Sequence, residues 1–280
     1  MNTRYLNIGS WNIEHFGKID DNDENQYALA EHIELSGVDI LALQELYLTE
    51  SHGYENIHLR EALDLVEEHT GCHWEYEIFP NRNENDKSQL CGIIWNKAKV
   101  EKIETFRIPV SYNADFEGQK LWLWDRSPHA IKFSAGKNKT DIVIVPLHMK
   151  SNVGSPHVVV RTRYEEAKTL IVNLPMVREK LEDEDIILIG DTNCKGSYED
   201  AIKEFVKGGF DDLNSDDVST FVRGDNAPFD RIFIARGEKR KSFLYSRQYI
   251  LRATNALAHD MYLSDHFVIK TSVKIRHDND

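Results

Sequence analysis

Three short runs of this 280-residue sequence are almost continuously apolar, and polar residues lie near the end of each run or directly after it. The runs extend from Val38 to Leu46, from Asp141 to Leu147 and from Ile186 to Gly190. Apolar runs of this length are typical of β-strands that are buried on both faces. Because further layers must cover such strands, the sequence predicts a layered fold with a large core.

Shorter patterns in the rest of the chain predict further strands and three helices. Strands are expected at residues 5–11, Trp74 to Phe79, Leu90 to Trp95, Val100 to Ile108, His129 to Phe133, Phe229 to Ile234 and Phe267 to Ile275. Helices are expected after the candidate cap Asn25, from Ile57 to His69, and around Tyr164 to Leu174, where Pro175 is expected to break or restart the helix.

The chain is expected to form one domain over residues 1–275, with a frayed polar tail over 276–280. The acidic stretch 211–228 is expected to be a loop, and the basic segment 236–252 a hairpin. Trp122 and Trp124 are expected to pack in the core.

Composition argues against several classes of protein. The three cysteines are too few and too widely spaced for a disulfide framework or a zinc ribbon. The first 20 residues lack the pattern of a secretory leader, and no apolar run approaches the roughly 20 residues of a membrane span. We therefore expect a cytoplasmic protein.

The net charge of the chain and the local distribution of its basic residues favour different conclusions about nucleic-acid binding. A formal net charge of -13 argues against broad electrostatic capture of nucleic acid. Basic residues nevertheless gather at Lys137 and Lys139, at Lys150, and in the segment 236–252. For the segment 236–252, a solvated basic face is the favoured interpretation, and a local phosphate-binding edge is the functional alternative.

Polar side chains that can bind a metal ion or take part in catalysis lie at the ends or beginnings of the predicted strands. They are Asn12, Glu45, His148, Asp191, Asn193, Asp230, Asp265 and His266. Singly, each has an ordinary explanation, such as an Asx turn for Asp191 and Asn193 or an exposed position for Glu45. Together, their carboxylates, amides and imidazoles suit a hard cation, Mg²⁺ or Mn²⁺, better than structural zinc. With Arg126 as a phosphate ligand, such a cation indicates attack on a phosphate ester.

Seven segments, in this order, resemble the motifs of the endonuclease/exonuclease/phosphatase superfamily, and in particular its deoxyribonuclease I-like members. The segments are Ser10-Trp11-Asn12-Ile13, Leu43-Gln44-Glu45, Arg126-Ser127-Pro128, Leu147-His148-Met149-Lys150-Ser151, Gly190-Asp191-Thr192-Asn193, Phe229-Asp230-Arg231-Ile232 and Ser264-Asp265-His266. The resemblance covers nearly the whole chain. It implies an α+β fold, the four-layer α/β/β/α sandwich.

The resemblance also implies a metal site and a catalytic pair. Asn12, Glu45 and Asp265 would hold Mg²⁺, for which Mn²⁺ can substitute. Asp230 would orient His266 and stabilise its charge, so that the imidazole can act on the phosphoryl oxygen or share in proton transfer.

The remaining site residues would handle water and phosphate. By the same resemblance, Asp191 and Asn193 would position the attacking water and the phosphate. His148 would assist acid–base chemistry, and Arg126 would contact the phosphate together with His148 and Asn193. Water would attack directly, without a covalent enzyme intermediate.

Two positions depart from the pattern of the family. Gln89 stands in the stretch where deoxyribonuclease I has a glutamate partner for the histidine equivalent to His148, so Gln89 is expected to orient His148 without a negative charge. Thr192 replaces a bulky apolar residue between the aspartate and the asparagine, which affects local packing more than chemistry.

The substrate is left open between several phosphoesters. We expect a nuclease that acts on DNA, with RNA as a further substrate. The alternative is a phosphatase or phosphodiesterase for a small-molecule or lipid phosphate, such as an inositol phosphate or sphingomyelin. A third hypothesis is a catalytically dead scaffold, against which the full set of acids and imidazoles argues. Nothing in the sequence indicates a protein partner.

Overall fold

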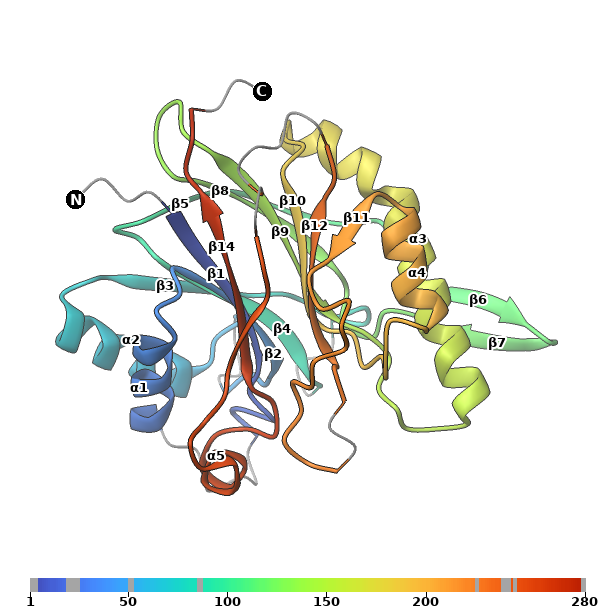
Figure 1. The fold of residues 1–280 in the computed structure, drawn as a ribbon, viewed down its shortest axis with the longest axis horizontal. Helices are drawn as coiled ribbons and strands as arrows, with labels where there is room; N and C mark the ends of the chain where they lie inside the picture. Colours follow the sequence, from blue (N-terminus) through green and yellow to red (C-terminus); the bar gives the residue numbers. More distant parts are fainter. Residues whose placement is uncertain are drawn as a thin grey trace.

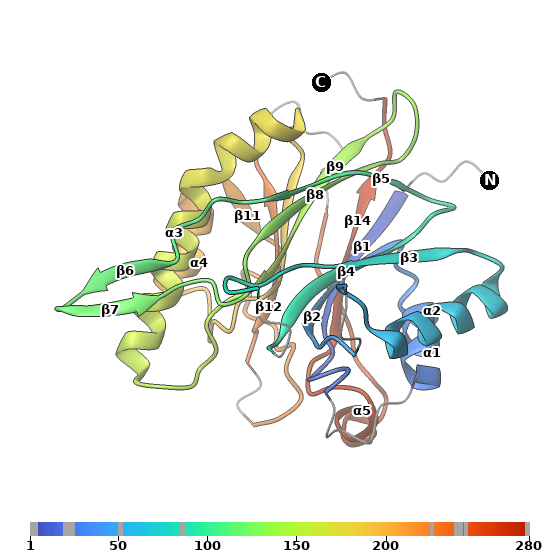
Figure 2. The same ribbon diagram turned by 180° about the vertical axis from the view of Figure 1, so that it is seen from behind.

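The computed structural model describes residues 5–18, 26–49, 53–84, 88–224, 227–237, 243 and 246–277 of the chain. Two six-stranded sheets face each other, with helices on their outer sides (Figure 1). A separate two-stranded ribbon projects from one side of the molecule (Figure 2). No helix in the described ranges is both long and apolar enough to cross a membrane.

The first sheet has the strand order β13-β14-β1-β2-β4-β3. Its strands are β1 (Tyr5–Asn12), β2 (Ile40–Leu46), β3 (Trp74–Ile78), β4 (Leu90–Asn96), β13 (Tyr249–Leu251) and β14 (Val268–Lys274). Strands β1 and β2 are parallel, and the other neighbours are antiparallel.

The second sheet has the strand order β11-β12-β10-β9-β8-β5. Its strands are β5 (Glu101–Arg107), β8 (His129–Ser134), β9 (Asp141–His148), β10 (Ile186–Asp191), β11 (Phe210–Asp212) and β12 (Asp230–Ala235). Strands β9 and β10 are parallel, and the remaining pairs are antiparallel.

Four helices cover the outer faces of the sheets. Helices α1 (Gln26–Ser36) and α2 (Ile57–Thr70) pack against the first sheet, and α3 (Pro156–Leu181) and α4 (Asp200–Lys207) pack against the second. Alternation along β9 builds two apolar layers at once, because Ile142 and Ile144 face the first sheet while Val143 and Val145 face the helices. The fold is therefore the predicted four-layer α/β/β/α sandwich.

Helix α3 continues without a break through Pro175, so the predicted break there is wrong. Pro175 lies on the exposed side of α3, where water can satisfy the carbonyl that loses its partner. Leu174, Val177 and Leu181 keep the buried side continuous across the proline. Packing of this apolar side against the sheet outweighs the local cost of the proline.

Several elements were not predicted. They are the ribbon of β6 (Asn113–Phe116) and β7 (Gln119–Trp122), helix α4, strand β11 within the expected acidic loop, and helix α5 (Ala256–Tyr262). The described part of the segment 236–252 does not form the expected hairpin. Its one strand, β13, pairs instead with β14 in the first sheet. Asn25 and most of residues 238–245 lie outside the described residues.

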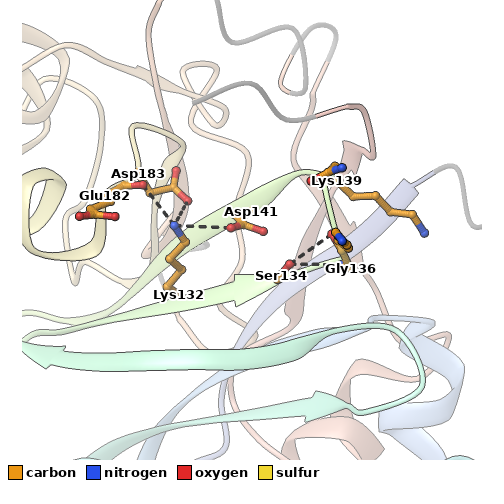
Figure 3. A pocket seen from close by; sticks show the side chains of 9 residues that line it. Lys132, Ser134, Gly136, Lys139, Asp141, Glu182 and Asp183 are labelled. Atoms are coloured by element: carbon orange, nitrogen blue, oxygen red, sulfur yellow. Dashed lines mark hydrogen bonds and ion pairs between the residues drawn. The ribbon is translucent and has the colours of Figure 1, made fainter.

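The cations at Lys137 and Lys139 lie far from the predicted site. They line the pocket at the β8–β9 turn, where Lys132 Nζ donates to the Leu181 carbonyl at 3.0 Å and lies 3.4 Å from Asp183 Oδ2 (Figure 3). Lys139 and His148 are nine positions apart along β9 and its turn, or about 30 Å of extended chain. These lysines therefore do not contact a phosphate at His148, and Lys132 instead anchors the end of α3.

Candidate active site

The polar strand ends meet in a cavity of about 650 Å³ at one end of the two sheets. Of the predicted residues, Glu45, His148, Asp191, Asn193, Asp265 and His266 line this cavity. Parallel pairing of β9 with β10 places Asp191 beside His148, and antiparallel pairing of β10 with β12 places Asp191 beside Asp230. The registers of the second sheet thus bring three segments together that lie far apart in the sequence.

A β-bulge in β2 turns Glu45 towards the cavity. The pairing of β2 with β4 shifts register between Leu43 and Leu46, and Glu45 has a φ of 65°. A bulge adds one residue to a strand and re-aims the neighbouring side chains. Gln44 remains in the core, where its Nε2 donates to Ser10 Oγ at 3.0 Å and ties β2 to β1. The two adjacent polar residues therefore serve different purposes.

A glycine allows β10 to pass close to β9 just before Asp191. A Cβ atom on Gly190 would lie 2.1 Å from the Leu147 carbonyl oxygen, and the φ of Gly190 is 147°. Asp191 Oδ1 accepts from the Asn193 backbone N–H at 2.7 Å, which is the predicted Asx turn. Because this turn uses Oδ1, Asp191 Oδ2 is left for the cavity.

Asn12 joins the two sheets at the back of the cavity. Its side-chain Nδ2 donates to Glu45 Oε1 at 3.2 Å and to Asp191 Oδ2 at 3.1 Å. Its Oδ1 accepts from the Glu14 backbone N–H at 3.1 Å. The amide therefore fixes one carboxylate from each sheet relative to the other.

His266 is held from both its ring and its backbone. The ring Nδ1 lies 2.8 Å from Asp230 Oδ2, and the Thr220 hydroxyl donates to the same oxygen at 2.6 Å. The His266 carbonyl accepts from Trp11 Nε1 at 3.0 Å and from His259 Nε2 at 2.9 Å. With Nδ1 committed to Asp230, the Nε2 atom is the one that faces the cavity.

Nearby charges and burial set the protonation of these groups. Desolvation lowers the pKa of His266, but Asp230, Asp191 and Asp265 outweigh it and raise that pKa to about 10. His266 Nε2 lies 3.9 Å from Asp191 Oδ2 and 3.7 Å from Asp265 Oδ1. Burial raises the pKa of both aspartates to about 6 against the opposing effect of His266. At neutral pH, His266 is a cation that faces two carboxylates.

His148, in contrast to His266, is a neutral imidazole. Burial, followed by the charge of Arg126, holds the pKa of His148 well below its usual range, so the ring is neutral at neutral pH. Its Nε2 lies 3.8 Å from Glu45 Oε1, and its buried Nδ1 has no hydrogen-bond partner among the described residues. The expectation that Gln89 orients His148 is therefore wrong, because Gln89 Nε2 lies 3.1 Å from His15 Nδ1 instead.

His15 was missed by the sequence analysis. Its Nδ1 lies 2.9 Å from Glu45 Oε2, and this contact, opposed by burial, raises the pKa of His15. The φ of His15 is 60°, so a left-handed turn after β1 places the ring at the cavity. The only signal in the sequence is its position three residues after Asn12.

The cations of the site differ from those predicted. Arg126 Nη2 donates to the Met149 carbonyl at 2.8 Å, beside His148, and Arg126 is not one of the residues that line the cavity. Its buried Nε has no hydrogen-bond partner among the described residues. Lys195 and Arg223, which the sequence analysis did not select, do line the cavity.

The predicted metal ligands offer the right kind of atoms for a hard cation. Glu45 and Asp265 line the cavity together with Glu14, and the charge of each neighbouring acid contributes to the raised pKa of Asp265. Crowded carboxylate oxygens of this kind fit a divalent ion such as Mg²⁺. Within the described part of the chain, however, no group of three or more acidic, histidine or cysteine side chains is already arranged as a metal site.

Comparison with known proteins agrees with this architecture. The chain matches the Endonuclease/Exonuclease/phosphatase family over residues 9–275. No curated protein sequence matches it. An endonuclease/exonuclease/phosphatase from Bacteroides vulgatus is similar in structure, with a TM-score of 0.66 and 15% identity, and the likeness covers 98% of this chain and 100% of that one.

Two further solved structures share the fold. The human Nocturnin catalytic domain with bound sulfate has a TM-score of 0.63 and 15% identity, covering 99% of this chain and 97% of that chain. Danio rerio TDP2 complexed with single-strand DNA product has a TM-score of 0.58 and 16% identity, covering 97% and 99%.

The match over nearly the whole chain shows that this protein belongs to the Endonuclease/Exonuclease/phosphatase family. Members of this family are phosphoester hydrolases that generally use divalent metal ions. The chain is accordingly a phosphoesterase of the deoxyribonuclease I-like fold.

Proposed function

We propose that this protein is a Mg²⁺-dependent phosphodiesterase that hydrolyses nucleic acid, with DNA as the favoured substrate and RNA as a further one. The observation that carries the proposal is the His266–Asp230 pair, joined at 2.8 Å, whose free imidazole nitrogen faces the carboxylates of the cavity. A buried imidazolium beside acids is suited to a reaction in which negative charge develops on a phosphoryl group.

His266 acts as a hydrogen-bond donor to that phosphoryl oxygen. Because Asp230 keeps the proton on Nδ1, and because His266 is protonated at neutral pH, Nε2 also carries a proton that it can donate. The fixed position of the ring means that little reorganisation is needed when charge develops on the phosphate. Asp230 is therefore a positioning residue for His266.

Asp191 and Asn193 position the attacking water and the phosphate. Asp191 Oδ2 lies near both His266 Nε2 and His148 Nε2, each at 3.9 Å, so it is the acceptor at the centre of the site. With a pKa of about 6, this carboxylate is ionised at neutral pH and can accept a proton from water. Asn193 Nδ2 donates to the Met149 carbonyl at 3.3 Å, which holds its amide beside Asp191.

Asn12, Glu45 and Asp265 would hold the divalent ion. When bound, Mg²⁺ supplies positive charge that polarises the phosphate and stabilises the leaving oxygen, and Mn²⁺ can substitute for it. The direct contact of Asn12 with Glu45 keeps one of these carboxylates oriented. His148, neutral and facing Glu45, is placed to exchange a proton with the leaving group. Arg126 does not line the cavity and would support the phosphate by its charge beside His148.

A small-molecule phosphoester is the second candidate substrate. Its support is that the chain has a net charge of -13, and that Lys137, Lys139 and Arg236 lie at the ends of strands opposite to the cavity. These residues therefore add little to the attraction of a long polyanion at the site.

Cleavage assays separate the two candidates. The purified protein is incubated with plasmid, single-stranded DNA, RNA, inositol phosphates and sphingomyelin, each with Mg²⁺, with Mn²⁺ or with EDTA. We expect metal-dependent cleavage of DNA and its loss in EDTA. Turnover of only the small phosphoesters would refute the nuclease proposal, while turnover that persists in EDTA would refute the metal requirement.

A further inference from the structure

We propose that Trp122, at the base of the β6–β7 ribbon, is a stacking platform for an unpaired nucleobase of the substrate strand. This inference rests on the proposed action on nucleic acid and adds a preference for single-stranded substrate near the cleaved bond. It starts from the failure of one prediction, since Trp124 is fully buried in the core but Trp122 is 55% exposed.

The backbone explains why the two tryptophans differ. Along β7, Leu121 points into the core and Lys120 and Trp122 point away from it, as strand alternation requires. Trp124 lies beyond the strand with a φ of 51°, which breaks the alternation and turns its ring inwards. The indole of Trp122 is therefore left outside by the ribbon itself, on the side of the ribbon that does not face the core.

Two cations lie against the exposed indole. The guanidinium carbon of Arg82 is 5.1 Å from the Trp122 ring centroid, and Lys120 Nζ is 4.4 Å from it. Arg82 is fixed in this position, because its Nη1 donates to the Leu123 carbonyl at 3.1 Å and its Nη2 lies 2.9 Å from Asp125 Oδ1. Both cations lie over the ring itself. Arg82 is held there, whereas the side chain of Lys120 is exposed and can move aside for a base. An indole with cations beside it binds single strands, since the ring stacks on a base while the cations attract the backbone.

The platform is close to the catalytic cavity. Trp122 and Arg126 are four residues apart, so their Cα atoms lie at most about 14 Å from each other. The Arg82 backbone N–H donates to the Asp125 carbonyl, directly before Arg126. The Met149 carbonyl accepts from both Arg126 Nη2 and Asn193 Nδ2. These two hydrogen bonds connect Arg126 to Asn193, which lines the cavity.

This distance sets which base reaches the platform. The bound of about 14 Å ends at Arg126, which lies beside the cavity, so the base on the platform is a few nucleotides from the cleaved bond. Bases in a duplex are stacked on their neighbours and offer no free face to an indole. A strand that passes from the cavity over Trp122 must therefore be unpaired within those nucleotides.

Substitution of Trp122 tests the platform with matched controls. Trp122→Ala removes the ring and Trp122→Phe retains a smaller one, while Tyr5→Ala removes an aromatic ring that is 50% exposed at the far end of β1. Each variant is assayed on a single-stranded oligonucleotide and on bis(p-nitrophenyl) phosphate, a phosphodiester without bases. Binding of a fluorescent single strand in EDTA, measured by anisotropy, adds a readout that does not require cleavage.

For Trp122→Ala we expect about a tenfold rise in KM and in Kd for the single strand, equivalent to about 1.4 kcal/mol. Its kcat and its turnover of bis(p-nitrophenyl) phosphate should stay unchanged, and Trp122→Phe should recover most of the affinity. Equal affinity in Trp122→Ala, Tyr5→Ala and wild type would overturn the platform while leaving the nuclease proposal intact. A wild-type protein that neither binds nor cleaves any nucleic acid, yet hydrolyses the small phosphodiester, would overturn both.

Discussion

Replacing Asp230 with asparagine removes one negative charge from a fully buried position and leaves the side-chain volume almost unchanged. In the wild-type protein, Asp230 Oδ2 is bonded to both His266 Nδ1 and the Thr220 hydroxyl. The asparagine can keep one hydrogen bond but cannot balance a cationic ring. We therefore expect Asp230→Asn to fold and to lose most of its turnover.

The size of the loss follows from the pKa of His266. A rise from 6.5 to about 10 corresponds to about 5 kcal/mol in favour of the cation at about 1.36 kcal/mol per pKa unit. Three carboxylates supply this preference, and Asp230 contributes most among them. Its removal returns the pKa of His266 towards the ordinary value of 6.5, so the ring loses up to about three quarters of its cationic form at pH 7 and up to about 97% at pH 8. This loss predicts a fall in kcat of up to about fourfold at pH 7 and up to about 30-fold at pH 8.

The assay is turnover of bis(p-nitrophenyl) phosphate at pH 8 with Mg²⁺, because this substrate makes no contacts with bases and because the wild-type His266 is still a cation at that pH. Thr220→Val is the matched variant, since it removes a hydroxyl that donates to Asp230 at 2.6 Å but keeps the charge. We expect this variant to lose about tenfold or less. Circular dichroism and thermal unfolding establish that both variants fold.

The reasoning would be refuted by either of two results. Asp230→Asn could retain a kcat within about threefold of the wild type, which would mean that the imidazolium is not needed. Thr220→Val could be as damaging as Asp230→Asn, which would mean that the geometry of the loop matters and the charge of Asp230 does not.

Three further perturbations test the metal site, the core and the close packing of the strands. Glu45→Ala should abolish turnover and weaken Mn²⁺ binding, measured by water-proton relaxation, because it removes a central oxygen ligand. Burial lowers the pKa of His129 to about 4, so between pH 6.5 and 4 the unfolded chain takes up a proton that the folded protein does not. Stability should therefore fall by up to about 3 kcal/mol over this range, and His129→Phe should lack this part of the fall in urea unfolding. Gly190→Ala should destabilise the fold by about 3 kcal/mol because its Cβ would meet the Leu147 carbonyl, whereas Gly118→Ala, also at positive φ but with open space, should cost less.

Each of these expectations has a contradicting result. Undiminished Mn²⁺ binding in Glu45→Ala would remove Glu45 from the metal site. Parallel pH profiles of unfolding for wild type and His129→Phe would mean that His129 titrates normally in the folded protein. Equal losses of stability in Gly190→Ala and Gly118→Ala would mean that backbone conformation alone, without the clash, sets the cost.

The sequence was informative wherever a functional residue belongs to a strand. Asp191 and His148 each follow a buried apolar run, and parallel strands in register bring their ends to one edge of the sheet. The pattern of each run therefore predicts the place of the polar residue after it. Glu45 also follows this rule, although the bulge that aims it could not be predicted from composition alone.

Residues carried by loops were not predictable in the same way. His15 and Arg223 reach the cavity through turns that have no periodic pattern, and Arg82 reaches Trp122 through contacts with residues about 40 positions away. The expectation that both tryptophans pack in the core failed for Trp122, which strand alternation leaves outside, whereas a positive φ at Trp124 turns the second ring inwards. Loop conformation depends on distant contacts, and a single sequence does not display them.

The placement of cations has a consequence for the salt dependence of binding. In a strand of about 3.3 Å per residue, six positions span about 20 Å, so Asp230 and Arg236 lie at opposite ends of β12. Lys139 likewise lies away from the site. Four cations remain near the path of the strand: Arg82, Lys120, Arg126 and Lys195. Arg223 also lines the cavity, but its charge is balanced by Glu14 and Asp265.

Four phosphate contacts predict that the logarithm of the association constant falls with a slope of about -3 against the logarithm of salt concentration, at about 0.7 per contact. Participation of the two lysines at the β8–β9 turn and of the six basic residues in 236–252 would raise the number of contacts to about twelve and give a slope of about -8. Anisotropy titrations of a labelled single strand in EDTA, between 50 and 200 mM KCl, distinguish the two. A slope near -8 would mean that the strand reaches around the molecule to the basic clusters, and that strand ends alone do not define the binding surface.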